Sequence, residues 1–268
     1  MPLLIKLFWI FNVTIQRKTF LPIRLIHMTI VISIFGNYFD TRQPAAFITK
    51  TVYENYIIHL QTNTNANDQT IYSYCNGLKV ILNYFMENEY IAPFEIMLPK
   101  REKKLKETYT DFELKVLLKK PDVKHCNFSE YRSWVLTNFL LGTGQRLSTV
   151  ANIKIQDIDF DNNCIVLTKT KNRIQLIIPL SHTLSSVVTE YLKYRQGEAE
   201  DYLFCNQYGG KLTKSGMESA VRRYNLSRGV RRTSIHVYRH TFAKEWIKAR
   251  RRYVPLAKAF AGIAAWKW

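Results

Sequence analysis

The sequence is short of acidic charge. No Asp or Glu occurs before Asp40, and the 268 residues hold 21 acidic side chains against 39 lysines and arginines, a net charge of +18. Such a surplus opposes compaction by self-repulsion and favours a polyanionic partner. Nucleic acid is the first candidate partner and an anionic membrane surface the second. The remaining alternative is a basic surface that serves no partner.

Metal and cofactor motifs are also lacking. None of the four cysteines pairs with another at C-x-x-C spacing or lies beside a suitably spaced histidine pair, so we expect neither a zinc site nor any other metal. No phosphate-binding glycine loop, dinucleotide fingerprint or H-E-x-x-H motif is present, and no cofactor is expected. The cysteines are interpreted as small core residues of a cytoplasmic, reducing environment. They are Cys75, Cys126, Cys164 and Cys205.

Long hydrophobic runs are missing as well. The opening "MPLLIKLFWIFNV" is short and has no small-residue cleavage site, which argues against a signal peptide. The apolar stretch Leu25 to Phe39 is too short for a comfortable membrane span. We interpret residues 1–39 as an atypical leader and expect no membrane insertion. An out-of-frame start and an anchor for a membrane-surface protein are the alternatives.

Residues 40–97 are predicted to form a small helical domain. "TVYENYIIHL" reads as one helix, and a second begins with Asp68 as its N-cap. In the second helix Ile71, Tyr74 and Leu78 recur at steps of three and four, which indicates one buried stripe. Residues 98–109, rich in Lys and Arg, are predicted to be a basic linker. This linker either lies along a phosphate backbone or is a solvated connector.

Residues 110–268 are predicted to form a second domain. Thr110 and Glu113 make a capping box, and Glu130 to Leu141 is an apolar helix. Gly142 and Gly144 then permit a tight turn, after which a helix restarts. Three strand-like runs follow, and a further helix is capped by a serine. The fold class is therefore mainly α with a small antiparallel β-sheet. The three runs begin at Ile153, Cys164 and Ile174, and the capping residue is Ser181.

A few basic residues stand at places where chemistry is expected. Arg146 follows the glycine turn, and a lysine pair flanks the turn between the last two strands. His236 and Arg239 lie three apart on a predicted helix and His240 lies at four, so all three share a face. Two arginines can hold one phosphate through forked, charge-assisted hydrogen bonds. They would neutralise charge in a phosphoryl-transfer transition state, with lysine and histidine moving protons. The lysine pair is Lys169 and Lys171.

Three segments in this order resemble the phage integrases of the tyrosine recombinase family: "LGTGQRLSTVANIKIQDIDFDNNCIVL", "TKTKNRIQLIIPLS" and "HVYRHTFA". The likeness runs from about Ile71 to Lys248. It implies a helical core-binding domain followed by a catalytic domain, which together clamp duplex DNA. It also implies site-specific DNA strand cleavage and rejoining, as in the integration or excision of a mobile element. The implied catalytic residues are Arg146, Lys171 (or, in the other register of "TKTK", Lys169), His236 and Arg239, with His240 in support.

The chain departs from the family pattern after "KEWIK". Family members continue to an L-G-H segment and a tyrosine that forms a 3′-phosphotyrosyl link to DNA. Here Tyr253 comes too early and Tyr238 lies inside the H-x-x-R motif, so we expect no nucleophilic tyrosine in place and no cleavage. The alternative function is a non-catalytic DNA-binding protein that keeps the recombinase shell. Read in other frames, codons for "LAKAFAG" and "GIAAWKW" permit the family's usual ending, so a frameshift or truncation is our hypothesis.

Double-stranded DNA is the expected partner, and the symmetry of a duplex argues for several protomers assembling on it. A group of arginines near the C-terminal end is expected to contact the DNA backbone without reading its sequence. These are Arg222, Arg223, Arg228, Arg231 and Arg232. The target site, the mobile element and the oligomeric state have no signature in the residues.

Overall fold

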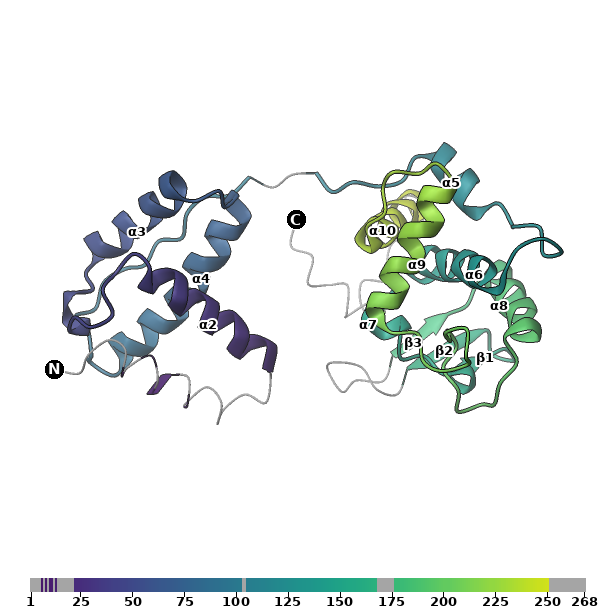
Figure 1. Cartoon of the computed structure of the whole chain (residues 1–268), viewed down its shortest axis with the longest axis horizontal. Coiled ribbons are helices and arrows are strands. Elements are labelled where there is room, and N and C mark those ends of the chain that lie inside the picture. Colours follow the sequence, from purple (N-terminus) through teal and green to yellow (C-terminus); the bar gives the residue numbers. More distant parts are fainter. Residues whose placement is uncertain are drawn as a thin grey trace. The chain divides into compact units, whose positions relative to one another are not determined.

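The computed structural model of the chain is mostly helical, with one small antiparallel sheet (Figure 1), which confirms the predicted fold class. The structure describes residues 6, 8, 10, 11, 13, 22–102, 105–167 and 176–250. The chain divides into two compact units, Met1–Lys104 and Leu105–Trp268. The division falls inside the segment that the sequence predicts as a basic linker.

In the N-terminal unit, helices α2, α3 and α4 pack around one core. Helices α2 and α3 both contact α4, and the core between them includes Val31, Phe35, Tyr56, Leu78 and Phe85. Residues from the expected leader therefore supply buried side chains to the same core as the helices that follow. Within the described residues, no helix combines the length and the apolar character that a membrane span requires. The helices are α2 (Pro22–Gly36), α3 (Lys50–Asn63) and α4 (Asp68–Glu87).

Helix α4 begins one residue earlier than its sequence pattern predicts. The N-cap is Asn67, whose side-chain oxygen accepts the Thr70 backbone N–H at 3.0 Å. Asp68, expected as the cap, is the first helical residue. It lies where a carboxylate interacts favourably with the positive end of the helix dipole.

The chain that leaves α4 is tied back onto the N-terminal unit. Lys79 Nζ donates to the Ile96 carbonyl at 3.0 Å, and the Arg101 guanidinium lies 4.1 Å from the centre of the Tyr72 ring. Arg101 Nη1 also donates to Gln69 Oε1 at 2.7 Å. The first part of the basic segment is thus anchored to its own unit and is not a fully solvated connector.

The C-terminal unit is arranged around α6, which contacts α5, α8, α9 and α10 (Figure 1). Most of the side chains of α6 are buried, as predicted for this apolar helix. The predicted capping box at Thr110 and Glu113 is confirmed, and so is the Ser181 cap, whose Oγ accepts the Leu184 N–H at 3.2 Å. The helices are α5 (Asp111–Leu118), α6 (Phe128–Thr143), α7 (Leu147–Val150), α8 (His182–Arg195), α9 (Lys214–Ser227) and α10 (Ile235–Arg250).

The first strand of the sheet is shorter than its sequence pattern predicts. Strands β1 (Ile158–Asp159), β2 (Cys164–Leu167) and β3 (Leu176–Pro179) pair antiparallel in that order. The run predicted as a strand from Ile153 is wrong over residues Ile155–Asp157, which form a 3-10 turn. There the backbone N–H of Ile155 donates to the carbonyl of Asp201, in the loop between α8 and α9, and not to a neighbouring strand.

Candidate functional site

The turn between α6 and α7 packs directly against α10. Gly144 ends α6 in the left-handed conformation, with φ of 58°, as the predicted glycine turn requires. A Cβ atom placed on Gly144 would lie 2.2 Å from a ring carbon of Phe242. Only glycine therefore allows this turn to lie so close to α10. Arg146 follows as the N-cap of α7, with an exposed side chain.

Helix α10 separates its buried and its polar side chains by face. Val237, Tyr238 and Thr241 are buried, with 5%, 0% and 1% of their surface exposed. His236 is exposed, and its ring stacks with that of His240 at a centroid distance of 6.4 Å. The i, i+4 spacing thus places the two imidazoles side by side, as the sequence predicts.

Arg239 links this helix to the glycine turn. Its Nη1 donates to the Gly144 carbonyl, which fixes the half-buried guanidinium next to the start of α7. Burial lowers the pKa of Arg239, and the positive charge of Arg146 lowers it further. The two arginines expected to act together are therefore close enough to repel each other. Within the described ranges, no carboxylate forms an ion pair with Arg239.

The histidines lie in the same positive environment. Burial lowers the pKa of His240, and the charges of Lys106, His236 and Arg239 lower it further. His240 is therefore mostly neutral near pH 7, since its pKa is below its usual value of 6.5. A concentration of positive charge at a half-buried site favours an anion, whose arrival would relieve the mutual repulsion.

Tyr238 is the tyrosine closest in sequence to these residues, and it belongs to the core. It is fully buried, its hydroxyl donates to Asn225 Oδ1 at 2.5 Å, and burial raises its pKa. Asn225 Nδ2 in turn donates to the Tyr109 hydroxyl at 2.9 Å and to the Arg232 carbonyl at 2.7 Å. This network holds α9, α10 and the start of the unit together, so Tyr238 supports the helix and cannot reach a substrate.

Three residues of interest from the sequence lie outside the described residues. They are Lys169 and Lys171 of the expected hairpin, and Tyr253.

Two of the five arginines expected on DNA are held by carboxylates. Arg228 donates to Glu130 at 3.2 Å, and Arg232 donates to Glu113 at 2.6 Å. Burial disfavours the ionised form of Glu113, but hydrogen bonds from Thr110 and the Arg232 guanidinium hold its pKa below its usual range. Arg228 and Arg232 therefore have a structural role within the protein.

The sequence of the C-terminal unit matches a known family. A sequence model of the phage integrase family matches residues 107–255, which is more than half of the chain. The chain belongs to the phage integrase family. The match includes Arg146, the turn before it and the whole of α10, and it confirms the resemblance inferred from the three motifs.

Curated relatives of this integrase-family chain are tyrosine recombinases. It is 29% identical over 201 residues to tyrosine recombinase XerC of Staphylococcus epidermidis, covering 70% of this chain and 65% of the relative. It is 30% identical over 213 residues to XerC of Staphylococcus aureus, covering 69% of each chain. The chain thus matches just under two thirds of the length of the first of these relatives.

Solved structures of integrases share the fold. An integrase of transposon Tn1549, in complex with a circular intermediate DNA, superimposes with a TM-score of 0.70 at 17% identity, covering 91% of this chain and 87% of that one. A lambda integrase tetramer bound to a Holliday junction gives a TM-score of 0.72 at 13% identity, with 92% and 74% covered.

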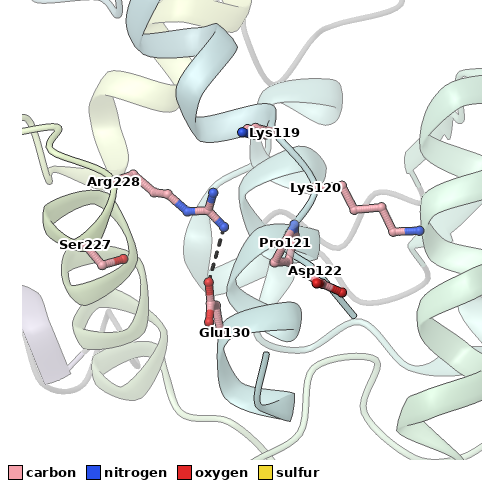
Figure 2. Close-up of a pocket in the computed structure, with 7 residues that line it drawn as sticks. All are labelled: Lys119, Lys120, Pro121, Asp122, Glu130, Ser227 and Arg228. Atoms are coloured by element: carbon pink, nitrogen blue, oxygen red, sulfur yellow. Dashed lines mark hydrogen bonds and ion pairs between the residues drawn. The ribbon is translucent and has the colours of Figure 1, made fainter. Parts of the chain in front are cut away.

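A pocket of the C-terminal unit is lined by other residues than the arginines and histidines of the candidate site. It has a volume of about 600 Å³ and lies beside the ion pair between Arg228 and Glu130 (Figure 2). Lys120, another lining residue, is bound to Glu190 at 2.6 Å. Charges of both signs at this pocket are thus paired within the protein.

The sequence did not predict two features of the candidate site. The Gly144 carbonyl as acceptor for Arg239 depends on a contact between residues far apart in the chain. Lys106 was included only in a basic linker, and nothing in the sequence placed it beside His240. The available signal was a lysine shortly before the capping box. Its place in the sequence did not show which part of the domain the side chain lies near.

Proposed function

We propose that this chain binds duplex DNA and that Arg146 and Arg239 hold a backbone phosphate between them. The observation that carries the proposal is the half-buried Arg239 guanidinium, whose charged neighbour Arg146 repels it. A phosphate between two such guanidinium groups accepts charge-assisted hydrogen bonds from both and removes their repulsion. The net charge of +18 supplies the longer-range attraction to DNA.

The histidines would complete the phosphate site. His236 is exposed and lies one turn before His240 on the same face of α10. A mostly neutral His240 can donate one ring N–H to a phosphate oxygen or accept a proton. The hairpin lysine, Lys171 or Lys169, is proposed as the proton donor to a leaving oxygen, as the family resemblance implies.

The family relation supports recombination as the activity to which this site belongs. The relatives are named tyrosine recombinases, and integrases with the same fold have been solved on DNA, in one case as a tetramer on a Holliday junction. We therefore propose site-specific strand cleavage and rejoining as the reaction for which this site is built, with several protomers assembling on the DNA.

Cleavage also needs a nucleophile, and we propose that the 268-residue chain does not supply one. Tyr238 is buried and hydrogen-bonded to Asn225, so its hydroxyl cannot attack a phosphate. Tyr253 lies outside the described residues and, by its position in the sequence, precedes the place of the family's nucleophile. On this proposal the chain binds DNA without forming a covalent link to it.

A nicked duplex that traps covalent intermediates tests both parts of the proposal. We expect salt-dependent binding of the full chain to this DNA, and no protein–DNA adduct on a denaturing gel. An adduct that disappears in Tyr253→Phe would show that Tyr253 is the nucleophile and that the chain is an active recombinase. Absence of salt-dependent binding would overturn the proposal as a whole. Pelleting with anionic vesicles instead would favour the membrane-surface alternative.

A further inference from the structure

The chain that enters the C-terminal unit is fixed along α10 before the capping box begins. The Tyr109 backbone N–H donates to Thr241 Oγ1 at 2.9 Å, and Lys244 Nζ donates to Thr108 Oγ1 at 3.3 Å. Glu107 lies 3.7 Å from Arg232, in the loop before α10. Three consecutive residues are therefore held by partners on α10 or just before it.

These contacts limit where Lys106 can lie. It directly precedes the three anchored residues, and its Cα lies within about 11 Å of that of Tyr109 by the reach of an extended chain. Thr241, the partner of Tyr109, directly follows His240. Lys106 is exposed, so its ammonium group can reach both solvent and the polar face of α10.

We propose that Lys106 is a further DNA-binding residue of this site, which contacts a phosphate next to the one held by Arg146 and Arg239. The inference rests on the proposed function, because it needs DNA at the site. Lys106 lies just outside residues 107–255, which match the integrase family model, so the family comparison assigns it no role.

The electrostatics of His240 agree with this position. After burial, the charge of Lys106 is the largest cause that lowers the pKa of His240, ahead of His236 and Arg239. Lys106, His236 and Arg239 all add positive charge around His240, and such a concentration of positive charge attracts a phosphate. The docked residues 107–109 hold the backbone next to Lys106 in place for this contact.

Lys106→Ala tests the proposal, with Lys193→Ala as the matched control. Lys193 is an exposed lysine in the last turn of α8, so both variants remove one surface charge. Binding of the full chain to a short duplex of arbitrary sequence is measured as a function of salt. Lys106→Ala should lower the slope of log K against log salt by about one and weaken binding about five- to tenfold near 0.1 M salt. Lys193→Ala should change both much less, and Lys106→Arg should restore both.

A second measurement shows whether Lys106 lies where the structure places it. Without DNA, the pKa of His240, followed by NMR, should rise in Lys106→Ala and stay unchanged in Lys193→Ala. Normal binding by the unaltered chain, with equal losses in the two alanine variants, would overturn this inference and leave the proposed function intact. No salt-dependent binding by the unaltered chain would overturn both.

Discussion

Two groups of arginines in the C-terminal unit differ in what surrounds them. Arg228 and Arg232, at the end of α9 and in the loop after it, are bound to Glu130 and Glu113. Arg239, on α10, is held by a backbone carbonyl, and its charged neighbour is Arg146. The first group is neutralised within the protein, whereas no described carboxylate forms an ion pair with Arg239. A net charge alone does not tell these two uses of arginine apart.

The two groups rest on different local structure. Gly144 lies against Phe242, and its carbonyl accepts a hydrogen bond from Arg239, so the Arg239 guanidinium is held by a closely packed turn. Gly229, in the loop of the ion-paired group, also has a positive φ, of 74°, but a Cβ atom there would meet open space. Both glycines thus have a positive φ, but Gly144 also allows close packing against α10, whereas Gly229 only allows a turn.

Substitution of Gly144 and of Gly229 should give the largest difference between the two groups, measured as the loss of folding stability. Gly144→Ala should lower the free energy of unfolding by about 2–4 kcal/mol, since it adds a clash with Phe242 to the left-handed backbone strain. Gly229→Ala should cost about 1 kcal/mol, from the backbone alone. Chemical denaturation of both variants measures the difference. Equal losses would show that the contact between the turn and α10 is not close.

Loss of the Arg239 side chain should weaken DNA binding more than any other single change discussed here. Arg239→Ala should weaken it about 10- to 100-fold, because charge-assisted hydrogen bonds contribute about 1.5–3 kcal/mol. Arg239→Lys should recover only part, since an ammonium group lacks the forked geometry. Fluorescence anisotropy at fixed salt gives the affinities, and thermal melts check that each variant is folded. Full binding by a folded Arg239→Ala would exclude Arg239 from the interface.

Arg232 should show the opposite behaviour. Arg232→Ala should lower the free energy of unfolding by about 1 kcal/mol, because it removes the ion pair with the half-buried Glu113. Its effect on the salt dependence of DNA binding should be smaller than that of Arg239→Ala. Paired denaturation and salt titrations of the two variants provide the comparison. A larger loss of salt dependence in Arg232→Ala would place the ion-paired group on DNA.

The smallest expected effect is that of pH, through His240. Its pKa is lowered by burial and by Lys106, His236 and Arg239, so protonation is unfavourable in the free protein and easier beside a phosphate. DNA binding should therefore tighten about threefold as the pH falls from about 8 to about 6. The stability of the fold should change in the opposite direction to DNA binding. Because the pKa is lower in the folded than in the unfolded state, stability falls as the pH drops below the unfolded value of 6.5.

His240→Gln should reduce both responses. DNA affinity and the free energy of unfolding, both measured across this pH range, test whether binding tightens and stability falls as the pH is lowered. Binding that weakens as the pH falls would contradict the positive environment of His240.

Local signals in the sequence predicted local structure well. The capping box at Thr110 and Glu113 and the cap at Ser181 depend only on neighbouring residues, and both are confirmed. The shared face of His236 and His240 follows from the helical repeat alone. The strand predicted over Ile155–Asp157 failed because its backbone partners come from a loop about 45 residues later, which no local pattern shows.

Long-range features of the site were outside the reach of sequence patterns. The bond from Tyr109 to Thr241 joins residues 132 positions apart, and it fixes the chain just after Lys106 against α10. The pairing of Arg232 with Glu113 likewise joins separate elements. From the sequence alone, Arg232 was therefore grouped with the arginines expected to contact the DNA backbone. The likeness to integrases indicated which residues belong together, but not which arginines the protein neutralises itself.

The most direct test of the phosphate site is a double-mutant cycle on Arg146 and Arg239. DNA affinity is measured for the unaltered chain, the two alanine variants and the double variant, under one salt condition. If both arginines hold the same phosphate, their losses should not add: the double variant should lose at least about 1 kcal/mol less than the sum of the single losses. Strictly additive losses, or no loss in either single variant, would contradict the joint binding of one phosphate.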